Sequence, residues 1–263
     1  MNIWLDNFSA PKFGNTAEEV EDTFCPKNED VIIRNNIFIA LADGATDGTF
    51  SKYWAECLVS TFCNNYKDDF PCFIEESFAR WDTWKRDYIN LRNDNNKPLY
   101  WYEEAGFLRG SFSTLLGLHL IQTDNENSGK WKAVAIGDTC LFQIRNKQLI
   151  HKFPISNSIE FNTHPTLVSS NRELNNHLKD AVLETEGRWE TGDDFYLMTD
   201  ALSSWFLCNC EKGESPWEIL KTLYKSGDDF PSTYEYFPTW IEKLRIQKYL
   251  HNDDVTLLRI NII

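Results

Sequence analysis

The sequence lacks any apolar run that approaches the roughly 18 residues needed to cross a membrane. Residues 1–13 lack the basic start and the apolar stretch of a secretory signal, so we expect a cytoplasmic protein. No linker rich in Pro, Gly and Ser interrupts the chain, which favours one domain over residues 1–263. Positive charge is scarce, because 26 Lys and Arg residues face 40 Asp and Glu residues. Such an acidic chain repels nucleic acids and anionic membranes, so neither is an expected partner.

The seven cysteines fit neither a disulfide framework nor the CxxC spacing of a zinc site. Their odd number and their apolar neighbours indicate reduced thiols that pack as small core residues. The five histidines also show no ligand spacing. Apolar residues make up 42% of the chain and aromatic residues 14%, which is enough for a sizeable core.

Short apolar runs rich in Val, Ile and aromatic residues predict buried strands at residues 37–42, 113–121, 133–136, 140–144, 195–198 and 255–260. Polar segments at residues 124–130 and 146–147 indicate hairpin turns, and therefore antiparallel pairing. Apolar residues at helical spacing predict helices at residues 54–62, 73–91, 201–207, 216–224 and 234–249. Residues 93–106 show the weakest pattern and are expected to form a loop. Hairpins with helices outside them indicate an α+β fold of stacked layers.

Aspartates occur where predicted strands end. IALAD ends at Asp43, VAIGD at Asp138 and YLMTD at Asp200, while Asp253 shortly precedes the last strand. A strand end holds a carboxylate rigidly and still lets it reach a cleft. Gathered carboxylates repel one another unless a cation lies among them, and hard oxygen ligands select Mg²⁺, Mn²⁺ or Ca²⁺. One such aspartate is usually a turn or helix cap, but four of them indicate a metal site.

Read in order, these segments resemble the PP2C (PPM) family of metal-dependent serine/threonine protein phosphatases, in particular its compact bacterial members. Asn28-Glu29-Asp30 resembles the family's N-terminal NED motif, and residues 39–46 (IALADGAT) resemble its VADG motif. Residues 110–115 (GSFSTL) resemble its strand of small residues. The later family motifs are matched by residues 135–142 (AIGDTCLF), 193–200 (DDFYLMTD) and 253–257 (DDVTL). The resemblance spans about residues 20–262.

The resemblance implies a four-layer α-β-β-α sandwich with two central antiparallel sheets. It also implies a binuclear Mn²⁺ or Mg²⁺ centre at one end of the sandwich, which activates water for direct attack on phosphorus. By resemblance Asp43 bridges the two metals, and Asp200 and Asp253 complete the protein ligands of one of them.

The second metal would be held by the Gly44 carbonyl and by Glu29. Asp30 would orient the attacking water, and Asp138 would belong to a third, weaker metal site. All these roles are implied by the resemblance alone.

The sequence departs from the family pattern at the position of an arginine that binds the substrate phosphate, where it has Cys25. Lys27, Arg34 or Arg109 could replace that arginine, and the sequence does not choose among them. Ala45 stands where eukaryotic members carry a histidine that is a proposed general acid.

Three functions remain open from the sequence. The first is hydrolysis of phosphoserine and phosphothreonine in proteins, opposing a partner kinase. The second is a pseudophosphatase that binds a phosphoprotein or kinase as a regulator, and the third is a small-molecule phosphomonoesterase. The aspartates at positions 43, 200 and 253 favour an active enzyme, whereas Cys25 slightly favours the pseudophosphatase.

Overall fold

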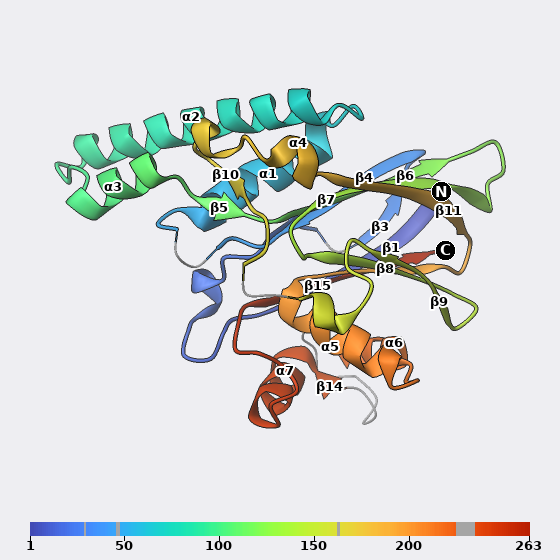
Figure 1. Ribbon diagram of the computed structural model, residues 1–263. Coiled ribbons are helices and arrows are strands. Elements are labelled where there is room, and N and C mark those ends of the chain that lie inside the picture. Colours follow the sequence, from blue (N-terminus) through green and yellow to red (C-terminus); the bar gives the residue numbers. More distant parts are fainter. Residues whose placement is uncertain (29, 46–47, 162–163, 225–234) are drawn as a thin grey trace.

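Two antiparallel sheets stack face to face between two layers of helices (Figure 1). The computed structural model describes residues 1–28, 30–45, 48–161, 164–224 and 235–263. One sheet has six strands in the order β3-β1-β15-β12-β8-β9, and the other has five in the order β11-β7-β6-β4-β2. The α-β-β-α sandwich expected from the sequence is thereby confirmed.

The six-stranded sheet is built from β1 (Asn2–Ala10), β3 (Asp30–Ile33), β8 (Cys140–Arg145), β9 (Gln148–Phe153), β12 (Asp194–Met198) and β15 (Val255–Ile262). The five-stranded sheet is built from β2 (Thr23–Cys25), β4 (Asn36–Ala42), β6 (Leu115–Gln122), β7 (Ser128–Ile136) and β11 (Leu183–Glu190). Short pairs join β5 (Phe112–Ser113) to β10 (Val168–Ser169), and β13 (Leu223–Tyr224) to β14 (Glu235–Tyr236).

Helices lie on the outer side of each sheet (Figure 1). Beside the five-stranded sheet lie α1 (Ser51–Asn65), α2 (Phe70–Asp94), α3 (Trp101–Arg109) and α4 (Leu178–Ala181). Beside the six-stranded sheet lie α5 (Asp200–Glu211), α6 (Pro216–Leu220) and α7 (Phe237–Ile246). Within the described ranges, no helix combines the length and the apolar composition that a bilayer span requires.

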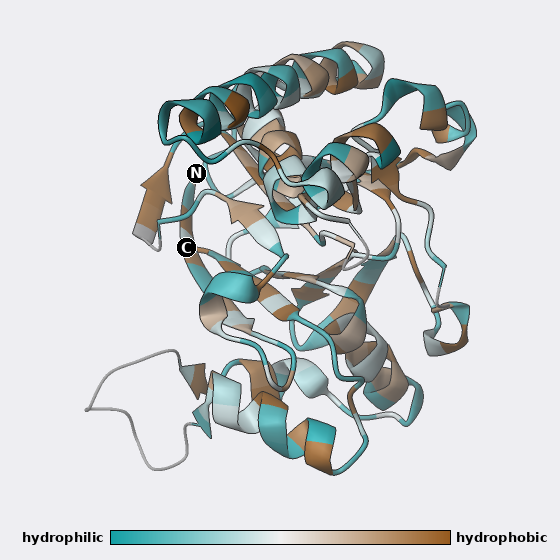
Figure 2. Cartoon of the chain, turned by 90° about the vertical axis from the view of Figure 1, so that its left-hand side faces the viewer, coloured by the Kyte–Doolittle hydropathy of each residue, from teal (hydrophilic) through white to brown (hydrophobic). Residues whose placement is uncertain are grey.

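Three apolar layers hold the sandwich together. Residues such as Ile39, Leu118 and Leu197 fill the space between the sheets, and all three are fully buried. A second layer lies between the five-stranded sheet and α1 and α2, and a third lies between the six-stranded sheet and α5–α7. Central strands are therefore covered on both faces, which explains why they appear as continuous apolar runs in the sequence. The hydrophobic colouring gathers on these strands in Figure 2.

The strands predicted from apolar runs are all present, and residues 146–147 form the expected hairpin turn with positive φ at both positions. In the two large sheets, strands β1, β2, β3, β9 and β11 were not predicted. In β11 the apolar signal is weak, because most of its side chains are exposed or half-buried. The predicted helix at residues 216–224 is shorter and ends at Leu220.

The loop expected at residues 93–106 is wrong, because α2 continues to Asp94 and α3 begins at Trp101. Tertiary contacts to one buried carboxylate explain the difference. Glu103 accepts hydrogen bonds from the Tyr88 hydroxyl and from the Tyr100 backbone amide (2.7 Å), and it pairs with Arg92 (3.1 Å). Burial alone would raise the pKa of Glu103, but these three partners lower it overall.

Replacing Glu103 with Gln or Ala should therefore weaken the contact between α3 and α2. We expect Glu103→Ala to cost about 2–3 kcal/mol in free energy of unfolding, because Arg92 loses its partner and the helix loses its N-terminal cap. Urea denaturation followed by circular dichroism measures this change. The neighbouring Glu104 is exposed, so Glu104→Ala is the matched control with a change below about 0.5 kcal/mol. Equal effects of the two substitutions would contradict the role given to Glu103.

Candidate metal centre

A cavity of about 700 Å³ lies where several strands end, and carboxylates line it. Asp43, Asp138, Asp200 and Asp253 all face this cavity, although up to 210 residues separate them in the sequence. The structure thus brings together the four strand-end aspartates that the sequence singled out.

Asp43 follows β4 and is held by the strand of small residues. Its amide donates to the Thr114 hydroxyl (2.9 Å), and its carbonyl accepts from the Ser113 hydroxyl (2.8 Å) and the Thr114 amide (2.9 Å). Gly44 is packed so closely that an added Cβ would lie 2.9 Å from the Glu21 carbonyl oxygen. Only glycine fits there without a shift of backbone.

The other cavity aspartates stand on separate elements. Asp138 lies in the turn between β7 and β8, after Gly137 with φ +96°. Asp200 is the first residue of α5, and Asp253 lies in the segment that leads into β15. The backbone of Asp253 is held in place by a hydrogen bond from the Arg245 guanidinium to its carbonyl. The same guanidinium also donates to the Pro11 carbonyl (2.7 Å).

A further buried carboxylate, Asp22, was missed by the sequence analysis. Strand β2 pairs with β4, and the pairing ends where Thr23 faces Ala42. The next residue on each strand is an aspartate, Asp22 on one and Asp43 on the other, so the two are neighbours. Asp22 is 7% exposed, and its Oδ2 accepts from the Thr199 hydroxyl (3.2 Å). In the described part of the chain its Oδ1 has no hydrogen-bond partner although it is buried. A buried carboxylate oxygen without a partner is costly unless something positive binds it.

Asp254 ties this segment to the site. Its two carboxylate oxygens accept from the backbone amides of Lys12 (2.8 Å) and Glu21 (2.9 Å). The signal for this region was present in the sequence, because Glu21-Asp22-Thr23-Phe24 is a second acidic pair that leads into an apolar strand. The pair at residues 29–30 was chosen instead because Asn28-Glu29-Asp30 resembles the NED motif of the PP2C family.

The structure does not bring Asp30 to the cavity. Asp30 begins β3 and pairs with Leu5 of β1. The end of β1 that is nearest the cavity is Ala10, which pairs with Val255, and this is five residues further along β1 than Leu5. Five residues along a strand correspond to roughly 17 Å, so the backbone of Asp30 lies well away from the site end, and the water-orienting role expected for Asp30 stays a prediction. Glu29 lies outside the described residues.

None of the three cations that could bind the substrate phosphate, Lys27, Arg34 and Arg109, is among the residues that line the cavity. Lys27 is exposed and donates to the Thr23 hydroxyl (2.8 Å), and Arg109 is exposed at the end of α3. Among the described residues, the cavity lining includes no Lys or Arg. It does include His164 and His251, which the sequence analysis did not place there because they show no ligand spacing.

Four carboxylates around the cavity have pKa values above the ordinary value of an aspartate. Burial, followed by the charge of Asp200, raises the pKa of Asp138 to about 7. Burial and the neighbouring Asp253 raise the pKa of Asp200 to about 6, although His251 acts in the opposite direction. Burial and the surrounding aspartates also raise the pKa of Asp43 and of Asp22 well above the usual range. Mutual repulsion of this kind disappears when a cation binds among the carboxylates.

These residues fit divalent cations by their chemistry. The donors are carboxylates and a close-packed glycine backbone, which suit Mg²⁺ or Mn²⁺ better than zinc. Asp43, Asp200, Asp253 and Asp22 are the side chains that would hold such ions. Among the described residues, no three His, Cys, Asp or Glu side chains form a ready-made metal site, so binding requires these side chains to converge.

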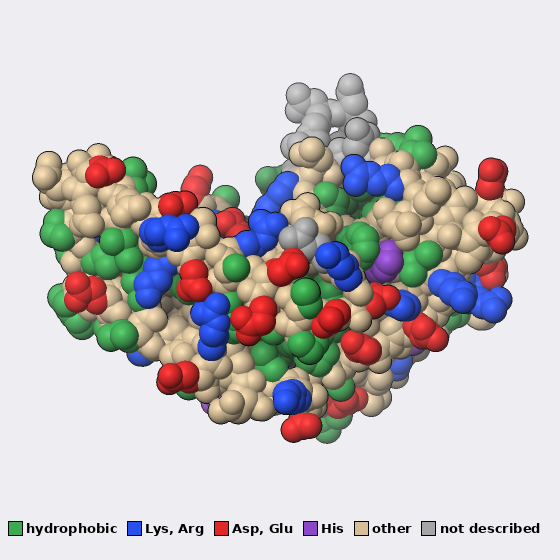
Figure 3. Space-filling model, turned by 90° about the horizontal axis from the view of Figure 1, so that it is seen from above, with side chains coloured by type: hydrophobic (Ala, Val, Ile, Leu, Met, Phe, Trp, Pro, Cys, Tyr) green, Lys and Arg blue, Asp and Glu red, His purple; other side chains and the backbone are tan. Residues whose placement is uncertain are grey.

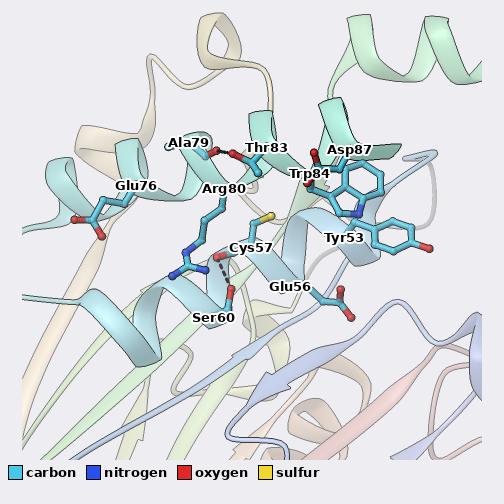
Figure 4. A pocket seen from close by; sticks show the side chains of 10 residues that line it. All are labelled: Tyr53, Glu56, Cys57, Ser60, Glu76, Ala79, Arg80, Thr83, Trp84 and Asp87. Atoms are coloured by element: carbon cyan, nitrogen blue, oxygen red, sulfur yellow. Dashed lines mark hydrogen bonds between the residues drawn. The ribbon is translucent and has the colours of Figure 1, made fainter. Parts of the chain in front are cut away.

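A second groove, of about 680 Å³, lies between α1 and α2 (Figure 4). Arg80 from α2 extends toward α1 at one end, and Tyr53 and Trp84 stack at the other with ring centroids 4.5 Å apart. The outer face of this helical layer carries acidic and basic side chains with apolar ones between them (Figure 3). Three carboxylates, Glu56, Glu76 and Asp87, line this groove together with the Arg80 guanidinium.

No family model matches the sequence, and no curated protein matches it either. Solved structures do match over the whole chain. The serine/threonine phosphatase PstP/Ppp of Mycobacterium tuberculosis is 14% identical with a TM-score of 0.53, and the match covers 100% of this chain and 99% of that one. The photosystem II phosphatase PBCP is 13% identical with a TM-score of 0.56, and 99% of each chain is covered.

The catalytic domain of PstP in complex with two manganese ions also matches, at 14% identity and a TM-score of 0.50, with 99% of each chain covered. These similarities show that the chain has the PP2C-type fold.

The raised pKa values predict how the metal-free protein responds to pH. A folded-state pKa above the unfolded value means that the folded protein holds protons which the unfolded chain has lost. Stability is therefore highest below about pH 4 for these groups and is lost as pH rises through about 6 to 7. We expect the melting temperature in EDTA to fall between pH 5 and pH 8, and Mn²⁺ to raise it more at pH 8 than at pH 5.

Differential scanning fluorimetry tests this expectation. Asp138→Asn should flatten the pH dependence in EDTA, because it removes the group whose pKa lies near 7. The exposed Asp124→Asn is the control and should leave the curve unchanged. A melting temperature in EDTA that rises toward pH 8 would rule out the proposed repulsion.

Proposed function

We propose that this protein is a PP2C-type phosphatase that hydrolyses phosphoserine and phosphothreonine in proteins with the help of two Mn²⁺ or Mg²⁺ ions. The observation that carries the proposal is the group of buried aspartates, with raised pKa values, at one end of a PP2C-type sandwich. The similar structures support the substrate class, because PstP is described as a serine/threonine phosphatase and was solved with two manganese ions.

Each residue of the group has a task that follows from its position. Asp43 feels the charges of the other four carboxylates and is suited to contact both ions. Asp200 and Asp253 approach from the six-stranded sheet. Bound ions would supply an acidified water and neutralise charge on the phosphoryl group. Asp22 takes the place proposed earlier for the pair at residues 29–30, since it is buried beside Asp43 with an oxygen free of hydrogen bonds among the described residues.

The substrate phosphate meets few positive side chains here. Among the described lining residues, His164 and His251 are the side chains able to carry positive charge. His251 is close enough to Asp200 to oppose the rise of its pKa. Most of the attraction for a phosphate must therefore come from the bound ions, because the carboxylates alone would repel it. Asp138 lines the same cavity and is the candidate for a third, weaker ion.

Removing one carboxylate should test the enzyme and its centre together. Asp200→Asn keeps the shape but lowers the negative charge, so we expect turnover of a phosphothreonine peptide with Mn²⁺ to fall at least about 100-fold. Peptide turnover and p-nitrophenyl phosphate hydrolysis are measured with EDTA, Mg²⁺ or Mn²⁺. Asp124→Asn, in an exposed hairpin, is the matched control and should retain wild-type rates.

The outcomes separate the three functions. Peptide turnover that depends on Mn²⁺ and is lost in Asp200→Asn supports the protein phosphatase. Turnover of p-nitrophenyl phosphate alone favours a small-molecule phosphomonoesterase. Binding of Mn²⁺ in calorimetry without turnover of either substrate favours a pseudophosphatase that binds a phosphoprotein or kinase.

The two acidic pairs can be told apart directly. Asp22→Asn should weaken Mn²⁺ binding by at least about tenfold in calorimetry, because it removes a buried negative charge beside Asp43. Asp30→Asn should leave the affinity unchanged, since Asp30 lies about 17 Å along the sheet from the site end. A loss of affinity in Asp30→Asn but not in Asp22→Asn would reverse the assignment.

A further inference from the structure

Two cysteines from distant parts of the chain meet beside β2. Cys25 ends β2 and Cys63 lies in the last turn of α1. The Cys63 thiol donates to the Cys25 carbonyl (3.3 Å) and to the Phe38 carbonyl (3.4 Å). Neither cysteine is needed by the proposed metal centre, and Cys25 stands out in the sequence as a departure from the family pattern.

Both side chains lie on the same side of the five-stranded sheet. Cys25 and Cys63 pack against the apolar layer between this sheet and α1, whereas the neighbouring Phe24 packs against the layer between the two sheets. This alternation is expected along a strand and directs Cys25 toward α1. Both residues are half-buried, so neither is sealed in the core as Cys57 and Cys140 are.

The two thiols differ in acidity. A hydrogen bond from the Cys63 thiol lowers the pKa of Cys25, and the Lys27 ammonium adds to this effect. Burial raises the pKa of Cys63, and its contact with Cys25 raises it further. The other buried thiols have raised values only, as for Cys57 with a pKa of about 12. A more acidic thiol beside a less acidic one is the arrangement of an attacking and a resolving cysteine.

We propose that Cys25 and Cys63 form a redox-active dithiol that hydrogen peroxide or an organic hydroperoxide converts into a disulfide between β2 and α1. This inference does not depend on the phosphatase activity.

Formation of one disulfide consumes one peroxide molecule. The Cys25 thiolate attacks one peroxide oxygen, the O–O bond breaks, and hydroxide leaves while the sulfur becomes a sulfenic acid. The Cys63 sulfur then attacks the Cys25 sulfur, the S–O bond breaks, and water leaves with the Cys63 proton. Two thiols lose two electrons in total, and the peroxide gains them.

The Cys63 sulfur already lies 3.3 Å from the Cys25 carbonyl oxygen, so the bond would form between residues that are in contact. Strand β2 has three residues and is the edge strand of its sheet, paired only with β4 among the described strands. A disulfide would fasten it to α1 and enclose the 37 residues between the two cysteines. Since Asp22 directly precedes β2, the bond constrains the strand that carries this carboxylate toward the metal centre.

Peptide mapping of the full-length protein tests the proposal. The reduced protein is treated with hydrogen peroxide, quenched, digested without reductant and analysed by mass spectrometry. We expect a single intramolecular link between Cys25 and Cys63, loss of two titratable thiols per chain, and a melting temperature that rises by several degrees and returns with dithiothreitol.

Variants separate the two roles. Cys63→Ser should leave a sulfenic acid at Cys25 that dimedone labels, and peroxide should no longer raise the melting temperature. Cys72→Ser removes an exposed thiol elsewhere and should behave as wild type. The pair Cys208 and Cys210 provides an internal control, because residues two apart in α5 point to different sides of the helix.

The proposal is overturned if peroxide links any other pair first, or if Cys25 stays reduced while Cys72 is oxidised. It is also overturned if Cys63→Ser gives the same products as the wild type. Should a serine variant fail to fold, the link and the reversible change in melting temperature of the wild type still decide the question.

Discussion

Repulsion among buried carboxylates at one end of the sandwich is the constraint on which the rest of this structure depends. Asp22 and Asp43 come from the five-stranded sheet, while Asp200 and Asp253 come from the six-stranded sheet. Burial, followed by the charge of Asp253, raises the pKa of Asp200 to about 6. The three apolar layers, which contain most of the large buried side chains, supply the stability that holds the sheets in this arrangement. The same repulsion is what a divalent cation would relieve.

The backbone around the carboxylates is fixed by bonds that cross between distant segments. Asp254 accepts from the amides of Lys12 and Glu21, and Arg245 joins the carbonyls of Asp253 and Pro11. These hydrogen bonds therefore fix the position of the N-terminal segment relative to the segment before β15. A site built this way is preorganised in its backbone, so that ion binding mainly has to order side chains.

The proposed dithiol of Cys25 and Cys63 would connect oxidation to this centre. Strand β2 carries Asp22 at one end and Cys25 at the other. A bond from Cys25 to α1 would act on a short edge strand that has only one neighbour among the described strands. The helical layer outside the five-stranded sheet would then be linked to the position of a carboxylate in the cavity.

The sequence by itself determined the central strands and the four aspartates at strand ends, because these follow from apolar runs and from residues adjacent in the chain. The four-layer arrangement was implied by the resemblance to the PP2C family. Helix α3 was decided by tertiary structure, since Glu103 is stabilised by Tyr88 and Arg92 of another helix. Tertiary structure also decided which of two acidic pairs lies beside Asp43. Glu21-Asp22 and Glu29-Asp30 look alike in sequence, and only the pairing of β2 with β4 and of β3 with β1 places Asp22 beside Asp43 and Asp30 on the far edge. Strand pairing is a contact between distant residues, which no local pattern records.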